Sequence, residues 1–272
     1  MKKLEDYRKA GEELYHKLNL STYPIAIKYI KDVSEIPEGI RRPSDRGQKW
    51  SLCQAFTYAR RWGWSVAMTS DDNFCTPSSV GQGWEEVSQE DMNQSQILQG
   101  WRKDAESERK MRRGNRIIDV GQRKGFVCSP LPETVIVPDS VLVYGTGEDI
   151  THIIHALAYE GEYIVESSFL GFGESCNKGA LIPFITQKPQ VVIPGTGDRT
   201  FSGVYDYEIA IGLPASLLFY VMDHLLATGG HLNMGRPVRT LLPQSITENI
   251  TPGFKFMREK IEEAKRKKQR KQ

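Results

Sequence analysis

The cysteines are the residues of this chain with the clearest chemical potential, and there are four of them in 272 residues. They are Cys53, Cys75, Cys128 and Cys176. No two share the Cys-x-x-Cys spacing of a thioredoxin-type couple or a zinc ribbon. A common metal or iron–sulfur site would therefore require the fold to bring distant thiolates together. The alternative is that they are inert buried side chains, because free cysteine often behaves as a small apolar residue.

The sequence settings of three cysteines favour a shared site. Cys75 and Cys176 lie in loops that follow predicted strands, where ligand-bearing groups gather in open α/β sheets. Cys53 enters a predicted helix, where the peptide dipoles favour a thiolate. Cys128 has apolar neighbours and fits a buried structural role better. We therefore expect Cys53, Cys75 and Cys176, with or without Cys128, to hold an iron–sulfur cluster, with zinc as the second choice.

A glycine turn offers a second kind of site. In Pro194-Gly-Thr-Gly-Asp-Arg199, the two glycines can expose backbone N–H groups, and the arginine can grip an anion with two hydrogen bonds. Gly195, Gly197 and Arg199 are therefore candidate cofactor-binding residues for a phosphate or carboxylate group. The alternative is an ordinary turn held by an Asp198–Arg199 pair.

The elements that must position these residues alternate between strand and helix, which predicts an α/β fold. We expect a mixed sheet built from two similar β-α-β units with flanking helices. The units lie within residues 20–84 and 134–180 and suggest an internal duplication, although alternation of this kind also arises by chance. The predicted elements are strand Ile25–Ile30, helix Ser51–Arg61 and strand Trp64–Met68, then strand Val141–Tyr144, helix Asp149–Tyr159 and strand Tyr163–Val165.

The domain organisation follows from charge and polarity. Residues 1–252 read as one α/β domain with a polar helical insertion at about 85–125, and residues 253–272 read as a C-terminal helix and basic tail. Residues 255–272 carry nine Lys/Arg and three Glu, hence +6, and the net charge of +2 leaves −4 for the first 254 residues. An acidic body argues against nucleic-acid binding. The N-terminus lacks a signal-peptide pattern and no apolar run is long enough to span a membrane, so we expect a cytoplasmic protein without a membrane partner.

Several short motifs occur in a fixed order along the chain: Pro24-Ile-Ala-Ile-Lys28, Cys53-Gln-Ala with Ala59-Arg60, Cys75, Glu174-Ser-Cys176, and Pro194-Gly-Thr-Gly-Asp-Arg199 followed by Glu208 and Pro214. In these motifs and their order the chain resembles domain-of-unknown-function family 169 of anaerobic bacteria and archaea. The resemblance spans most of the chain outside the insertion, and it implies a redox or metal-linked role for cysteines in these places.

Three functions follow as hypotheses from different classes. The first is a cysteine-based metal- or iron–sulfur-binding protein with a redox or cofactor-handling role, whose partner is a small molecule or a redox protein. The second is a metal-free module that binds a small anionic molecule. The third is an interaction protein that works through its insertion and tail. The sequence leaves open whether the protein is an enzyme and whether it forms a homo-oligomer.

Overall fold

The computed structural model describes residues 2–112, 118–228 and 252–269. The chain divides into two compact units, residues 1–228 and residues 229–272. Within the described residues, no helix combines the length and the apolar character needed to cross a membrane. The sequence also predicts a helix that opens at Pro214 and ends at Gly229-Gly230, and this end lies outside the described residues.

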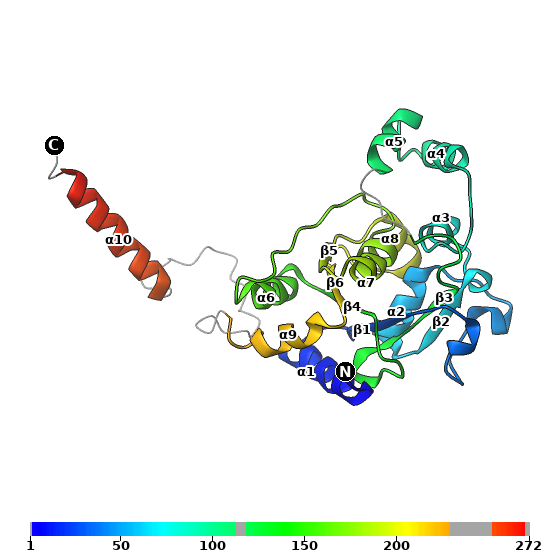
Figure 1. Cartoon of the computed structure of the whole chain (residues 1–272), viewed down its shortest axis with the longest axis horizontal. Helices are drawn as coiled ribbons and strands as arrows, with labels where there is room; N and C mark the ends of the chain where they lie inside the picture. Colours follow the sequence, from blue (N-terminus) through cyan, green and yellow to red (C-terminus); the bar gives the residue numbers. More distant parts are fainter. Residues whose placement is uncertain (1, 113–117, 229–251, 270–272) are drawn as a thin grey trace. The chain divides into compact units, whose positions relative to one another are not determined.

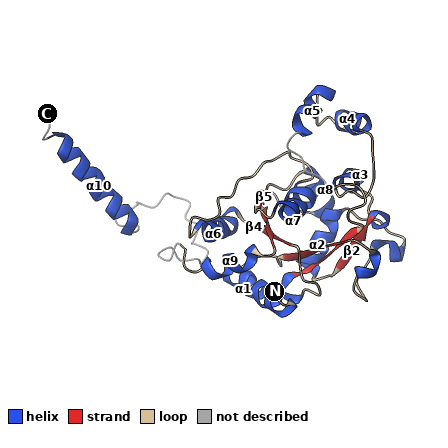
Figure 2. Cartoon of the chain, in the orientation of Figure 1, coloured by secondary structure: helices blue, strands red, loops and turns tan. Residues whose placement is uncertain are grey.

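The first unit is built on one six-stranded sheet with the strand order β2-β3-β1-β4-β6-β5. Helices lie on both sides of it (Figure 2), so the α/β class is confirmed. The expected mixed pairing is not seen, because each pair of neighbouring strands in this sheet is antiparallel. The strands are β1 (Ile25–Ile30), β2 (Val66–Thr69), β3 (Gly125–Pro130), β4 (Ser140–Gly145), β5 (Gln190–Val192) and β6 (Ile209–Pro214).

The strand order repeats itself across the middle of the sheet. β1 and β2 run parallel with β3 between them, and β4 and β5 run parallel with β6 between them. The two halves meet where β1 pairs with β4. This topology agrees with two similar β-α-β units, but the second unit reaches further along the chain than 134–180. The strand expected at Tyr163–Val165 is wrong: this segment pairs with no strand, and Ile164 is 83% exposed. β5 takes its place.

The helices cover the two faces of the sheet (Figure 1). One face carries α2, with its neighbour α8, and the π-helix η5, with its neighbours α3 and α7. The other carries α6 and α9, with α1 packed against α9. The helices are α1 (Leu4–Lys17), α2 (Leu52–Trp62), α3 (Thr76–Gly81), α6 (Gly147–Ala158), η5 (Glu174–Leu181), α7 (Ile182–Thr186), α8 (Thr196–Ser202) and α9 (Leu217–His224), with 3₁₀ turns η1 (Val33–Glu35), η2 (Pro43–Arg46), η3 (Ser70–Asp72) and η4 (Leu131–Glu133).

The core that supports the site lies between the sheet and the pair α2 and η5. Strand register places Cys128 opposite both Ile27 and Val66, and Leu142 opposite Ile25, so these side chains share one face of the sheet. All five are fully buried in one apolar cluster with residues of α2 and η5. Burial of this kind is the main stabilising term of a domain of this size.

Two glycines let η5 lie directly on the sheet. A β-carbon on Gly212 in β6 would stand 1.8 Å from the carbonyl oxygen of Gly179 in η5, so a side chain there cannot be accommodated without a shift. A β-carbon on Gly179 would meet the Leu142 side chain at 2.8 Å. The backbone of η5 therefore packs against the strands at a distance that only glycine allows.

The insertion and the C-terminal segment are helical where they are described. The polar insertion contains α4 (Gln89–Leu98) and α5 (Ala105–Arg112), in agreement with the sequence. The second unit contains α10 (Pro252–Gln269), whose described side chains are exposed. The last residues of the basic tail, 270–272, lie outside the described residues.

Candidate cysteine site

Cys53 is placed by the start of α2. Ser51 caps the helix: its side chain accepts a hydrogen bond from Gln54 N at 3.2 Å, and the Gln54 side chain accepts one from Ser51 N at 2.8 Å. This reciprocal arrangement fixes the first helical turn. The Cys53 sulfur consequently lies 3.0 Å from Ser51 Oγ and donates to Gly197 O in α8 at 3.8 Å. Cys53 is buried.

Cys75 is brought beside Cys53 by a short backbone pairing. Trp50 N donates to Asp72 O at 2.8 Å, and Phe74 N donates to Trp50 O at 3.1 Å, so the chain before α3 runs alongside the start of α2. The buried Asn73 side chain then holds the backbone of Cys75, accepting from its N–H at 3.0 Å and donating to its carbonyl at 2.9 Å. Cys75 is half-buried at the N-terminus of α3.

Cys176 lies in the first turn of the π-helix η5. The Glu174 side chain closes the preceding glycine loop by accepting from Leu170 N and from Gly171 N, the latter at 2.9 Å. Gln82, which follows α3, donates to Cys176 O at 3.2 Å and so joins the two helices. π-helices are rare and often occur at functional positions. The segment that holds Cys75 and the segment that holds Cys176 are therefore in direct contact.

The fourth residue of the candidate site, beside the three cysteines, is Asp198 in α8. Its carboxylate accepts from Gly195 N at 2.9 Å and is buried. Thr196 N donates to Gly171 O at 3.3 Å, which ties α8 to the loop before η5. Burial raises the pKa of the Asp198 carboxyl, and hydrogen bonds from the Gly195 and Ser175 backbone partly offset that effect.

The electrostatics show that the three thiols and Asp198 share one neighbourhood. Burial raises the pKa of Cys53 to about 12, and the charge of Asp198 acts in the same direction. Burial also raises the pKa of Cys176 well above 9.0, and the charges of Asp198, Cys75 and Cys53 raise it further. Without a bound cation, Cys53 and Cys176 are therefore protonated at neutral pH.

The structure brings together the three cysteines that the sequence grouped and keeps Cys128 apart. Cys128 lies in β3 within the core, where burial raises the pKa of its thiol. Within residues 2–112, 118–228 and 252–269, no three His, Cys, Asp or Glu side chains are arranged to hold a metal ion as they lie. Metal ligation by these thiols therefore stays a prediction, which requires their side chains to turn toward a common point.

The glycine turn that was expected to bind an anion uses its donors within the protein. Gly195 N bonds to Asp198, as described above. Arg199 donates to Tyr205 O at 2.8 Å and to Asp206 at 3.3 Å, so it does not hold the turn by pairing with Asp198. Anion binding by Gly195, Gly197 and Arg199 stays a prediction, and it requires these hydrogen bonds to be exchanged.

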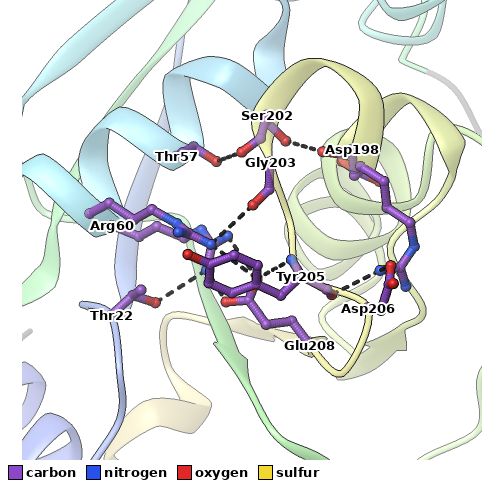
Figure 3. Close-up of polar contacts among 11 residues, drawn as sticks. Thr22, Thr57, Arg60, Asp198, Ser202, Gly203, Tyr205, Asp206 and Glu208 are labelled. Atoms are coloured by element: carbon purple, nitrogen blue, oxygen red, sulfur yellow. Dashed lines mark hydrogen bonds and ion pairs between the residues drawn. The ribbon is translucent and has the colours of Figure 1, made fainter.

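A buried polar network joins α2 to α8 and to the segment before β6 (Figure 3). Arg60 in α2 forms a two-pronged ion pair with Glu208, just before β6, and its guanidinium lies 4.3 Å from the centre of the Tyr144 ring. One turn earlier in α2, Thr57 donates to Ser202 O at the end of α8 at 3.0 Å.

Sequence reasoning named the cysteines but did not assign roles to the polar residues around them. Glu174 and Gln82 are almost fully buried, and one acceptor oxygen of each, Oε2 of Glu174 and Oε1 of Gln82, has no hydrogen-bond partner among the described residues. Buried polar atoms without partners usually mark water, an ion or a ligand. An acid two positions before Cys176 was a usable signal for Glu174, whereas nothing local indicated Gln82.

Comparison with known proteins places this site in a family. The model of domain-of-unknown-function family 169, described as "Uncharacterised ArCR", matches residues 13–224. The chain belongs to this family. It is also similar to an uncharacterised protein of Methanocaldococcus jannaschii, with 21% identity over 223 residues that cover 81% of this chain and 94% of the relative. No solved structure matches the chain.

All the site residues described above lie inside the family match, and α10 lies outside it. The cysteine site thus belongs to the part of the chain that defines family 169. The family description and the relative's name assign no reaction.

Proposed function

We propose that Cys53, Cys75 and Cys176 bind a thiophilic metal centre, an iron–sulfur cluster first and zinc second, in a cytoplasmic redox or cofactor-handling role. The observation that carries the proposal is the convergence of three thiols from three separate segments beside the buried carboxylate of Asp198. Placing these groups close together makes an unfavourable contribution to the free energy of folding, because their charged forms are buried and repel one another.

The donor set suits a soft cation. Three thiolates satisfy most positions of an iron–sulfur cluster or a tetrahedral zinc ion and leave one position for another ligand. Two acidic side chains, Asp198 and Glu174, are buried nearby. Burial raises the pKa of Glu174, the charge of Lys178 lowers it, and the charge of Asp198 raises it further. A negative interior favours a bound cation and disfavours the small anion of the second hypothesis.

Metal binding requires the buried thiols to lose their protons. Cys53 and Cys176 hold theirs in the metal-free state and must release them to become ligands. The charge of Asp198 favours the protonated forms of both thiols, so a bound cation has to offset it for the protons to be released to solvent. Metal affinity should therefore increase with pH, because each released proton is part of the binding equilibrium.

The test is the metal and sulfide content of protein purified without oxygen. We expect iron and acid-labile sulfide, or zinc, near stoichiometry with the chain, and a loss of most of it in Cys176→Ser. Cys128→Ser is the matched control, because Cys128 is as deeply buried but lies outside the site. Metal-free wild-type protein, or equal losses in both variants, would contradict the proposal.

A further inference from the structure

The C-terminal helix α10, drawn in red in Figure 1, carries large apolar side chains that are exposed to water. Phe256 is 57% exposed, Met257 is 58% exposed and Ile261 is 49% exposed. Apolar surface in water is unfavourable, and a group of such residues on one side of a helix often marks an interaction surface.

The apolar residues of α10 do lie on one side. At about 100° per residue, Met257, Ile261 and Ala264 share one face of the helix, because they follow one another at four and three positions. Phe256 lies at the border of this face, where its ring centre is 5.6 Å from the Lys260 ammonium group. The helix is therefore amphipathic.

The charged residues of α10 are sorted around that apolar face. Basic residues border it on both sides, whereas the acidic residues lie opposite it. The bordering basic residues are Arg258 and Lys265 on one side and Lys260 and Lys267 on the other, and the acidic residues are Glu259, Glu262 and Glu263. An anionic surface that met the apolar face would thus meet positive charge along both borders, with the acidic residues on the far side.

Ion pairs within the helix do not balance this positive charge. Lys260 pairs with Glu263 at 3.0 Å, and Lys265 pairs with Glu262 at 2.8 Å. Exposed pairs of this kind contribute little stability, so both lysines can exchange these carboxylates for another anion. The nine Lys/Arg and three Glu of residues 255–272 still leave a net charge of +6.

A lipid surface is the partner that fits both the apolar face and its basic borders. A coiled coil with a second copy of α10 is disfavoured, because the apolar stripe is short and the basic residues beside it would repel their counterparts. An acidic protein segment could satisfy the charge without any need for the apolar stripe. Helices with an apolar face and many Lys/Arg, by contrast, lie in the interface of membranes that contain anionic lipids.

We infer that α10 lies along an anionic membrane surface, with Met257 and Ile261 among the acyl chains and the bordering Lys/Arg residues on the lipid phosphates. The inference is independent of the cysteine site. The sequence-based expectation of no membrane partner was drawn from the absence of a spanning segment, and a helix that lies parallel to the surface requires none. The cytoplasmic leaflet carries the anionic lipids that this helix needs.

The test is co-sedimentation of the full-length protein with phosphatidylcholine vesicles, with and without about one third phosphatidylserine. We expect an apparent affinity at least about tenfold higher for the vesicles with phosphatidylserine. It should fall by about tenfold when the salt concentration is raised from about 0.1 to about 0.5 M, because salt screens the exposed charges.

Two pairs of variants separate the apolar and the charged contributions. Met257→Ser with Ile261→Ser should weaken binding by about tenfold or more, whereas Leu98→Ser with Met111→Ser should not change it. Leu98 and Met111 are matched controls, since they are apolar helix residues that are 76% and 38% exposed outside α10.

Lys260→Ala should weaken binding by about fivefold. Lys110→Ala is its matched control, because Lys110 is also an exposed helix lysine paired with a glutamate, Glu106, and its loss should have no effect. The thermal unfolding midpoint of the first unit should be unchanged in the α10 variants, since the substituted side chains are exposed.

The inference is overturned if phosphatidylserine does not increase binding, or if the control variants lose as much as their partners. It is also overturned if Met257→Ser with Ile261→Ser binds as well as the wild type, since the helix would then recognise negative charge alone, as for an acidic protein. Metal content is measured on the same samples. Metal-loaded protein that ignores the vesicles would defeat this inference alone, and metal-free protein that binds them would defeat the proposed function alone.

Discussion

At the scale of single residues, neighbours rather than burial distinguish the cysteines. Burial raises the pKa of Cys53, Cys128 and Cys176 alike, but the charge of Asp198 acts on Cys53 and Cys176 alone. The sequence grouped Cys53, Cys75 and Cys176 from a helix start and two loops after predicted strands. The structure places these three thiols in one neighbourhood, although Cys176 lies within the π-helix η5 rather than in a loop. The partner Asp198 could not be recognised in the same way, because its relation to Cys53 is created by the packing of α8 on α2.

Asp198→Asn tests whether that carboxylate is kept for function. Its pKa in the folded protein is raised above 3.8, so its favourable contribution to folding is present below that pH and is lost as the pH rises through the folded pKa. At neutral pH the variant should therefore be at least as stable as the wild type, since the asparagine oxygen can still accept from Gly195 N. Urea unfolding at neutral and acidic pH measures this, and the wild type should gain relative to the variant in acid.

A loss above about 2 kcal/mol at neutral pH would instead make the Asp198 carboxylate a structural anchor.

At the scale of elements, the site depends on close contacts between backbone segments that no local sequence pattern predicts. η5 reaches the sheet because Gly179 and Gly212 face each other, although they lie in separate segments of the chain. Sequence patterns located β1, β2 and β4 but predicted no strand at β3 or β6. They also placed a strand at Tyr163–Val165, where β-branched residues occur without a strand to pair with. Pairing is a long-range property, so composition alone could not separate that segment from β5.

Gly212→Ala should displace η5, because the new β-carbon would collide with the Gly179 carbonyl. We expect a loss of about 1–3 kcal/mol in unfolding free energy, as for overpacking of a core. Gly147→Ala is the control, since a β-carbon there meets no atom within 4 Å and should be neutral or stabilising. Equal effects of the two substitutions in denaturant unfolding would refute this account of η5.

Glu208→Gln should break the buried ion pair that holds α8 and β6 to α2. Although burial alone raises the pKa of Glu208, hydrogen bonds from Arg60 and its charge lower it overall below 4.5. The stabilising contribution is therefore present above pH 4.5 and is lost as the pH falls toward the folded pKa. At neutral pH we expect a loss of about 3–5 kcal/mol, because the Arg60 charge is left unpaired.

The exposed pair Lys110–Glu106 supplies a control: Glu106→Gln should cost less than about 0.5 kcal/mol. The hypothesis fails if the Glu208→Gln difference, measured by chemical unfolding, does not shrink in acid.

At the scale of the whole molecule, the sequence predicted the α/β class, the family and the repeated β-α-β plan. It could not predict that β3 and β6 insert between parallel strands and make each neighbouring pair of the sheet antiparallel, because strand order depends on contacts between distant residues. The charge separation between an acidic body and a basic C-terminal segment was readable directly. The basic C-terminal segment lies beyond the family match.

Deletion of residues 265–272 tests whether the basic segment contributes to folding. The described side chains of this stretch are exposed, so their loss removes no buried contact among the described residues. The midpoint of thermal unfolding should stay within about 2 °C of the wild type, since exposed segments add little stability. Calorimetry that shows a larger drop would mean that the segment is part of the folded structure.

The most direct measurement of the central claim is a cobalt(II) titration of reduced, metal-free protein followed by its sulfur-to-cobalt charge-transfer absorbance. Thiolates are the ligands that produce this absorbance, so it reports ligation by cysteine itself rather than metal content. The account predicts a band that saturates at one cobalt per chain, is lost in Cys53→Ser, Cys75→Ser and Cys176→Ser, and is kept in Cys128→Ser. No charge-transfer band, or a band equal in all four variants, would contradict it.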